Sequence, residues 1–288
     1  MNRHAGQSRE GAHWAVVALP YAWLLVLFAL PFAIVAVISF GEAAPDRAPP
    51  VALTGTVRNY TFLFTDPLYV SAYLGSLRIA AISTMFCLLL GYPIAYAIAR
   101  APARWRPALL AAIVLPFWTS FLIRVYAWKG ILSENGLLNG FLRWSGLASD
   151  PGTLIGTEWA IYFGIVYAYL PFMVLPLYAT LEKLDGSLLE AAADLGATPA
   201  RAFLTVTLPL SLPGVVAGCL LVFIPAVGEF IIPDMLGGTE TLMIGKVLWD
   251  EFFANGDWPL ASAVATLMLA LLAVPIALFQ RLGAARPH

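Results

Sequence analysis

The sequence contains few charged residues. Only 11% of its 288 residues are Asp, Glu, Lys or Arg, and 60% are hydrophobic, whereas soluble domains are close to half apolar and a quarter charged. Long stretches with almost no charge predict membrane spans rather than the core of a soluble protein. The formal net charge of -1 offers no clustered basic face for phosphates, so we expect no nucleic-acid partner.

Cysteine and histidine are also scarce. Cys87 and Cys219 both lie inside apolar runs, where they fit neither a disulfide framework nor a metal site. His4, His13 and His288 are all close to the ends of the chain, so no Cys/His cluster has the spacing of metal ligands. Nor does the sequence group a nucleophile with an acid–base pair. We therefore predict no catalytic residue and no metal site.

A phosphate-binding loop is missing as well. The pattern G-x-x-x-x-G-K-[ST] does not occur, because Gly245-Lys246 is followed by Val247 and lacks the upstream glycine. We therefore expect this chain neither to bind nor to hydrolyse ATP, and we expect no cofactor on it.

Six apolar runs are long enough to cross a membrane as helices, which need about 20 residues each. They are Trp14–Phe40, Tyr73–Ile98, Pro107–Trp128, Glu158–Thr180, Ser211–Pro233 and Pro259–Gln280. The first run is longer than the apolar region of a signal peptide, so we expect an uncleaved span. Helices are expected because lipid offers backbone groups no other partner. The predicted fold class is therefore an all-α integral membrane protein.

Prolines fall inside or near every predicted span. They are Pro31, Pro93, Pro116, Pro171, Pro225 and Pro275. Proline removes one backbone hydrogen bond and clashes with the preceding turn, so we expect it to kink or break these helices.

Arginines between the second and third spans indicate the orientation. The short loop "ARAPARWRP" carries Arg100, Arg104 and Arg106, and short loops rich in Lys and Arg stay in the cytoplasm. With six spans, both termini are then cytoplasmic.

A polar stretch, "EAAADLGATPARAFLTVTLP", separates the fourth and fifth spans. Ser187 and Glu190 have the spacing of a capping box, and Gly196 is placed to end that helix in the left-handed conformation. Thr198 and Pro199 are typical of the cap and first residue of a second helix. Two readings are open: a structured connector, or a docking element for a cytoplasmic partner.

This stretch resembles the EAA motif of ABC-importer permeases. The matching residues are Glu190, Ala191, Ala192, Gly196, Leu208 and Pro209, with Val206 where the family has isoleucine. The resemblance implies a type I ABC importer permease fold with cytoplasmic coupling helices, in which the EAA loop at about 182–209, with Arg201, docks into the ATPase. It divides the chain into a first span with its external loop (1–72) and a five-helix permease core (73–288).

Other segments resemble putrescine/spermidine permeases, among them "LPFWTSFLIRVYAWKGILSENGLLN" and "YLPFMVLPLYATLEKLDGSLLEAAADLGA". The resemblance implies a non-enzymatic subunit of the bacterial inner membrane that passes polyamines through the lipid bilayer. Its implied partners are a second permease, two copies of a cytoplasmic ATPase that bind ATP and Mg²⁺, and a periplasmic polyamine-binding protein. A permease for another small cationic or amine solute is an alternative. So is a secondary transporter, which would usually show two halves with paired broken helices.

The charge pattern agrees with a cationic substrate. In this topology most of the 17 acidic residues lie outside, where they would attract cations. Glu229, in "VFIPAVGEFIIP", stands at membrane depth, at a cost on the order of 3 kcal/mol, and is a functional candidate by default. An ion pair of Glu229 with Arg124 is the alternative. The remaining candidates for the substrate path are Asp234 and three aromatic residues whose ring faces attract ammonium groups, Trp118, Tyr126 and Phe230.

Reporter fusions test the predicted topology. A reporter fused after Arg104 or Arg201 is expected in the cytoplasm, and one fused after Pro50 or Gly140 outside, because the arginine-rich loop stays inside. Activities of a periplasm-active and a cytoplasm-active reporter at each point measure this. An external reporter at Arg201 would contradict both the six-span topology and the docking loop.

Overall fold

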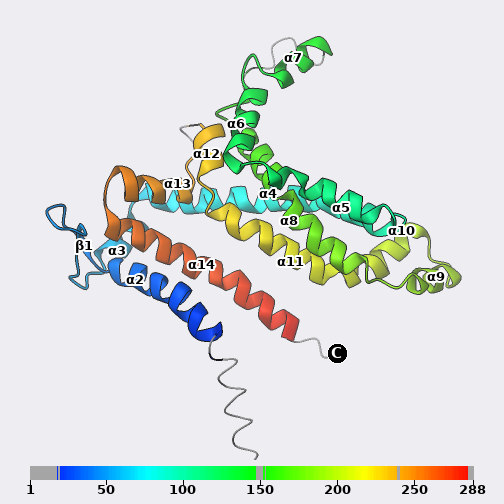
Figure 1. Ribbon diagram of the computed structural model, residues 1–288, viewed down its shortest axis with the longest axis horizontal. Coiled ribbons are helices and arrows are strands. Elements are labelled where there is room, and N and C mark those ends of the chain that lie inside the picture. Colours follow the sequence, from blue (N-terminus) through cyan, green and yellow to red (C-terminus); the bar gives the residue numbers. More distant parts are fainter. Residues whose placement is uncertain (1–17, 19, 147–151, 153, 239–240, 285–288) are drawn as a thin grey trace, which may run out of the picture. The chain divides into compact units, whose positions relative to one another are not determined.

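The computed structural model describes residues 18, 20–146, 152, 154–238 and 241–284, and these residues are almost entirely helical (Figure 1). One short antiparallel pair of strands, β1 and β2, joins Glu42 to Ala52 and Ala43 to Val51. The elements, in chain order, are η1 Leu25–Ala29, α2 Leu30–Ile38, β1 Glu42–Ala43, β2 Val51–Ala52, α3 Arg58–Thr65, α4 Pro67–Arg100, α5 Arg106–Val114, η2 Leu115–Trp118, α6 Phe121–Leu132, α7 Leu137–Trp144, α8 Glu158–Leu181, α9 Ser187–Asp194, α10 Pro199–Ala202, η3 Phe203–Thr207, α11 Leu208–Val227, α12 Ile231–Leu236, α13 Ile244–Trp249, η4 Asp250–Ala254 and α14 Trp258–Ala284.

Five helices in the described part of the chain are long and apolar enough to cross a membrane, and the count is six when a bent pair of helices is taken as one span. The five are Pro20–Ile38, Pro67–Arg100, Glu158–Leu181, Pro199–Val227 and Trp258–Ala277. The prediction of an all-α protein with about six spans is confirmed. The predicted start of the first span, Trp14, lies outside the described residues.

The third predicted span is broken. Helices Arg106–Trp118 and Phe121–Trp144 meet at an angle of 89°, so the expectation that the predicted span Pro107–Trp128 is kinked or broken near Pro116 is confirmed. Pro116 lies in the 3₁₀ turn η2, and Thr119 behind it is extended, with φ -98° and ψ 153°. Proline lacks the N–H that would continue the α-helix, and α5 ends at Val114, two residues before Pro116; the gap itself lies at Thr119 and Ser120, just after η2. Elsewhere α4, α8, α11 and α14 run through their internal prolines without a gap.

The described residues form two compact units. One contains the chain up to Asp66 together with Leu248–Leu269, and the other contains Pro67–Val247 and the chain from Ala270 onward. The first unit holds α2, the strand pair and α3. Both candidate sites described below lie in the second unit.

Three helices, α4, α8 and α11, form the core of the second unit by packing closely through glycines. Met173 of α8 is fully buried. A Cβ added at Gly91 of α4 would lie 2.9 Å from Met173 Cγ, and one at Gly218 of α11 would lie 2.7 Å from its sulfur. Gly214 leaves less room still, since a Cβ there would lie 2.5 Å from Thr180 Oγ1. Gly214 and Gly218 thus form the small-xxx-small pattern through which membrane helices approach one another.

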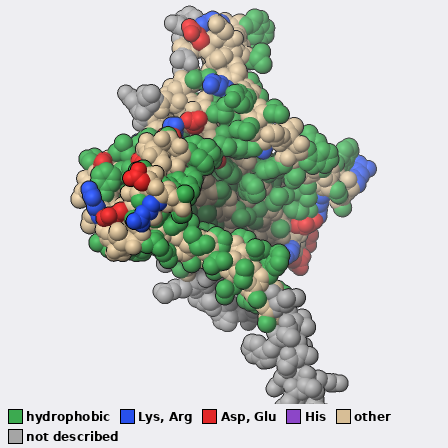
Figure 2. Space-filling view, turned by 60° about the vertical axis from the view of Figure 1, so that its left-hand side comes forward, with side chains coloured by type: hydrophobic (Ala, Val, Ile, Leu, Met, Phe, Trp, Pro, Cys, Tyr) green, Lys and Arg blue, Asp and Glu red, His purple; other side chains and the backbone are tan. Residues whose placement is uncertain are grey.

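The surface matches a lipid environment. Figure 2 shows hydrophobic side chains over most of the visible face, with charged side chains confined to a few separate groups. Many large apolar residues are exposed along the apolar helices, Leu74, Leu89 and Leu221 among them. In water such a surface would favour association, whereas hydrocarbon solvates it.

Replacing Gly214 by alanine tests the close packing. Gly214→Ala is expected to destabilise the protein by about 1–3 kcal/mol, as overpacking does, because the new methyl group would also lie 2.9 Å from the backbone oxygen of Pro176. The matched control is Gly130→Ala in α6, where a Cβ meets nothing within 4 Å. Thermal unfolding in detergent compares the two. Equal melting temperatures for both variants would contradict the packing.

Candidate functional site

The loop between α8 and α11 begins with a helix cap that differs from the predicted one. Helix α9 begins at Ser187 itself, with Gly186 in the cap position and no side-chain cap bond there. The Ser187 N–H donates instead to Asp185 Oδ1 at 3.0 Å, and this bond holds the pKa of the Asp185 carboxyl below its ordinary value. The capping box predicted for Ser187 and Glu190 is therefore wrong, because Asp185, nearer in the chain, takes the first N–H.

The end of α9 follows the prediction. Gly196 has φ +81°, the left-handed conformation that only glycine adopts readily. Its N–H donates to the Ala193 carbonyl at 2.8 Å, and the N–H of Ala197 donates to the Ala192 carbonyl at 2.9 Å. These two bonds form a Schellman motif. Gly196 thereby fixes the direction in which the chain leaves α9.

The second helix starts at the predicted residue, but it continues without a gap into the fifth span. The Thr198 hydroxyl accepts from the Arg201 N–H, and Pro199 occupies the first turn. From Pro199 the chain continues through α10, η3 and α11 to Val227 as one helix of 29 residues. The span predicted over Ser211–Pro233 is wrong at both ends: the helix starts 12 residues earlier, and Val227 ends it before Gly228.

Most of the predicted coupling residues are accessible. Glu190, Ala191, Gly196, Arg201 and Pro209 are exposed, while Ala192 and Leu208 are half-buried. Leu195, at the tip before Gly196, is 89% exposed. An apolar side chain displayed in this way, beside charged neighbours, has the character of a protein contact.

Aromatic contacts attach this loop to α4. The ring of Phe203 meets Tyr92 and Tyr96 edge-on, with centroids 5.6 Å and 5.9 Å apart. The Tyr92 hydroxyl is 2.9 Å from Ser211 Oγ at the start of α11. The loop and α4 also enclose a cavity of about 280 Å³ lined by the apolar side of α9 and α10. The loop is thus packed against the membrane helices.

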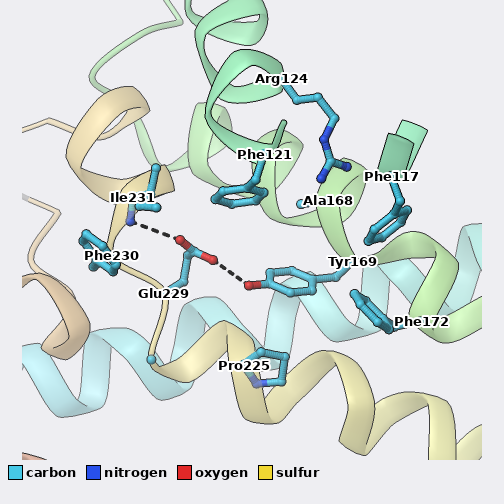
Figure 3. Close-up of a pocket in the computed structure, with 11 residues that line it drawn as sticks. Phe117, Phe121, Arg124, Ala168, Tyr169, Phe172, Pro225, Glu229, Phe230 and Ile231 are labelled. Atoms are coloured by element: carbon cyan, nitrogen blue, oxygen red, sulfur yellow. Dashed lines mark hydrogen bonds between the residues drawn. The ribbon is translucent and has the colours of Figure 1, made fainter. Parts of the chain in front are cut away.

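A second candidate site lies where α11 ends. A cavity of about 340 Å³ is lined by Phe117, Phe121, Arg124, Ala168, Tyr169, Phe172, Pro225, Gly228, Glu229, Phe230 and Ile231. Figure 3 shows the labelled side chains meeting from η2, α6, α8, the end of α11, the turn after it and the start of α12. Tyr169 is the twelfth residue of the 24-residue helix α8, so the cavity is level with the middle of that span. The sequence had placed Glu229 nearer the outer end.

The Glu229 carboxylate holds the broken segment together. The side chain is 7% exposed. Its Oε1 accepts from the N–H groups of Ile231 and Ile232, at 3.0 Å and 3.3 Å, and its Oε2 accepts from the Tyr169 hydroxyl at 2.6 Å. Two free amides at the start of α12 are thereby satisfied. An ionised carboxylate offers about four acceptor sites, and these three bonds leave one.

Arg124 does not pair with Glu229. Its guanidinium lies over two rings, with Cζ 4.9 Å from the centroid of Phe117 and 5.6 Å from that of Phe121. Nε and Nη1 are buried and have no hydrogen-bond partner among the described residues. The ion pair considered as the alternative role of Glu229 is therefore not formed.

The other predicted path residues fall in different places. Phe230 lines the cavity, whereas Asp234 binds Lys246 across α12 and α13 with 2.6 Å between Oδ1 and Nζ. Trp118, 84% exposed, and Tyr126, also exposed, do not line the cavity. The structure thus brings together Glu229, Arg124 and Phe230 and leaves Asp234, Trp118 and Tyr126 outside.

Sequence reasoning missed four aromatic residues of the cavity, namely Phe117, Phe121, Tyr169 and Phe172. They lie in apolar spans in which aromatic side chains are common. For Phe117 and Phe121 the sequence offered one signal, because these two residues lie on either side of the helix break that follows Pro116. No pattern in the sequence pointed to Tyr169 as the partner of Glu229.

Comparison with known proteins places this geometry in a family. The family described as binding-protein-dependent transport system inner membrane component matches residues 13–287. The chain belongs to this family. It is therefore a multi-pass permease component of the inner membrane, and the predicted family resemblance is confirmed.

Relatives and solved structures agree with this assignment. The spermidine/putrescine transport system permease protein PotB of Haemophilus influenzae is 43% identical over 265 residues, 92% of each chain. PotB of Escherichia coli K12 is 42% identical over 259 residues, 90% of this chain and 93% of that one. A chain of the bacterial alginate ABC transporter, solved in complex with an alginate pentasaccharide-bound periplasmic protein, superposes with a TM-score of 0.72 at 17% identity, covering 94% of this chain and 93% of that one. The predicted permease fold of an ABC importer is thus confirmed.

Valine in place of Gly196 tests the loop geometry. Gly196→Val is expected to abolish transport while membrane insertion persists, because the left-handed conformation costs a side chain about 1–2 kcal/mol and the chain would leave α9 in another direction. Gly186→Val is the control, since Gly186 lies in the same loop at φ -60° and a Cβ there also meets nothing within 4 Å. Substrate uptake and the amount of protein in the membrane are measured for both. Normal uptake by Gly196→Val would contradict a coupling role for this turn.

Proposed function

We propose that this chain is the polyamine-translocating permease subunit of an ATP-driven importer. The observation that carries the proposal is the cavity at mid-membrane, in which one carboxylate, Glu229, faces a group of aromatic rings. Carboxylates and aromatic faces are the groups that bind ammonium ions in low-dielectric surroundings. The two PotB relatives are named as spermidine/putrescine permeases, which supports the same substrate class.

The proposal extends to the energy source and the partners. The missing nucleotide-binding loop supports binding of ATP and Mg²⁺ by a separate cytoplasmic ATPase, which we propose is present in two copies. The exposed turn from Glu190 to Arg201 is the surface that would receive it, with Leu195 as an apolar anchor. A second permease and a periplasmic polyamine-binding protein complete the importer, and both termini of this chain are cytoplasmic.

Glu229 suits a site for brief contact with a passing cation. Its carboxylate is held rigidly by Ile231, Ile232 and Tyr169, so little side-chain entropy is lost when a substrate arrives. One acceptor site remains for an ammonium group or its water. A single charge binds weakly enough for the substrate to leave again, as transport requires.

Uptake measurements test the substrate class. A strain lacking its own polyamine importers is supplied with this chain and its partner subunits, and uptake of labelled putrescine, spermidine and a neutral amino acid is followed. We expect saturable uptake of one or both polyamines and none of the amino acid. Uptake of the amino acid alone would contradict the proposal.

Glutamine in place of Glu229 isolates the charge. Glu229→Gln keeps a carbonyl oxygen for the amides of Ile231 and Ile232, so α12 is expected to stay in place. Loss of the charge should lower spermidine uptake about tenfold, an effect of about 1.4 kcal/mol, and putrescine uptake less, because putrescine carries fewer charges.

Tyr169→Phe is the matched control, since it removes the hydrogen bond to Glu229 and keeps the charge. Its ratio of spermidine to putrescine uptake should equal that of the unmodified protein. If Glu229→Gln lowers both substrates equally, or neither, Glu229 does not meet the cation.

A further inference from the structure

The cavity contains a cation of its own. Arg124 reaches into it from α6 (Figure 3), and its guanidinium lies over the faces of Phe117 and Phe121. Among the residues that line the cavity, Arg124 is the one base and Glu229 the one acid. The two do not form an ion pair, although both belong to the same small space.

Ring contacts hold the guanidinium. Nε and Nη1 are buried without a hydrogen-bond partner among the described residues, whereas buried charged groups ordinarily find one. Cation–π contacts are weaker than a buried ion pair. Another cation can therefore displace the guanidinium of Arg124 from the two rings. Its long stem lets the head move without a change in α6.

The rings beneath Arg124 are those that an incoming amine would use. Phe117 and Phe121 flank the break after Pro116 and face the same cavity as Glu229. An ammonium group drawn to Glu229 would meet a guanidinium already on the aromatic faces, and like charges repel strongly away from water. The cavity of about 340 Å³ is the space beside the guanidinium, so an ammonium group within it lies near a second cation, with Glu229 as the one carboxylate for both.

We propose that Arg124 is a tethered substitute for the substrate, occupying the aromatic part of the cavity until a polyamine displaces it. This rests on the proposed function, because it takes the same cavity as the substrate path. While Arg124 is in place, the cavity carries no net charge and presents a fixed positive group to inorganic cations, which excludes them as arginines do in other membrane pores. A polyamine, with several charges and an apolar stem, competes with it for both the rings and the carboxylate.

Direct binding of spermidine tests the exchange. The complete importer is purified in detergent without its periplasmic binding protein, and equilibrium binding of radiolabelled spermidine is measured. Arg124→Gln and Arg124→Met place two neutral side chains of equal length at this position. Each should lower the Kd for spermidine about tenfold, which corresponds to about 1.4 kcal/mol of binding free energy. Arg124→Lys keeps a cation and should stay within about twofold of the unmodified protein. Arg143→Gln removes an exposed arginine of α7 and should leave the Kd unchanged.

The outcomes separate this inference from the proposed function. Tighter binding by both neutral variants but not by Arg124→Lys supports the tethered cation. Unchanged, weaker or undetectable binding by the neutral variants overturns it, as does equal tightening by Arg124→Lys. The neutral Arg124 variants can give such a result while Glu229→Gln still lowers spermidine uptake more than putrescine uptake. In that case the proposed polyamine path is supported and the role proposed for Arg124 is wrong. If Glu229→Gln has no such effect, the cavity itself is wrongly assigned.

Discussion

The architecture of the cavity depends on the bonds between the Glu229 carboxylate and the free amides of α12. Inside a membrane, a helix can end only where its unpaired backbone groups find partners, because lipid offers none. Helix α11 ends at Val227, and Oε1 of Glu229 binds the N–H groups of Ile231 and Ile232. The residue that makes the break tolerable is therefore also the one that places a negative charge beside the cavity. Structural and functional roles of this carboxylate cannot be separated by deleting it, only by neutralising it.

A single helix connects the two candidate sites. Pro199–Val227 is 29 residues long, about 43 Å at 1.5 Å per residue. The Gly196 turn precedes it, and Glu229 follows it. Glycines 214 and 218 press its middle against α8, and Phe203 fixes its beginning between two tyrosines of α4. The helix is thus held at its beginning and at its middle, and it runs directly from the loop to the turn that carries Glu229.

Local signals in the sequence predicted much of this structure. Apolar runs predicted the spans, and Gly196, Thr198 and Pro199 predicted the turn, because each of these features depends on neighbouring residues only. The predicted capping box is wrong because Asp185 accepts the Ser187 N–H in place of Glu190. The predicted end of the fifth span is wrong because the sequence stays apolar past Val227, whereas the helix ends there. The aromatic side of the cavity depends on Phe117, Phe121 and Tyr169 meeting from three separate elements, and no local pattern records such a meeting.

The break in the third span shapes the part of the aromatic wall that Phe117 and Phe121 form. A straight helix through Pro116 would present Phe117 and Phe121 about 400° apart around its axis at 3.6 residues per turn, on nearly the same side but a full turn apart in height. The extended residues at 119–120 and the 89° bend instead bring both rings beside one guanidinium, within 4.9 Å and 5.6 Å of Arg124 Cζ. Backbone irregularity thus shapes both sides of the cavity: Pro116 sets the ring pair on one side, and the Gly228 turn sets the carboxylate on the other. Irregular backbone at membrane depth is tolerated where it lines such a cavity, and here it is what creates the site.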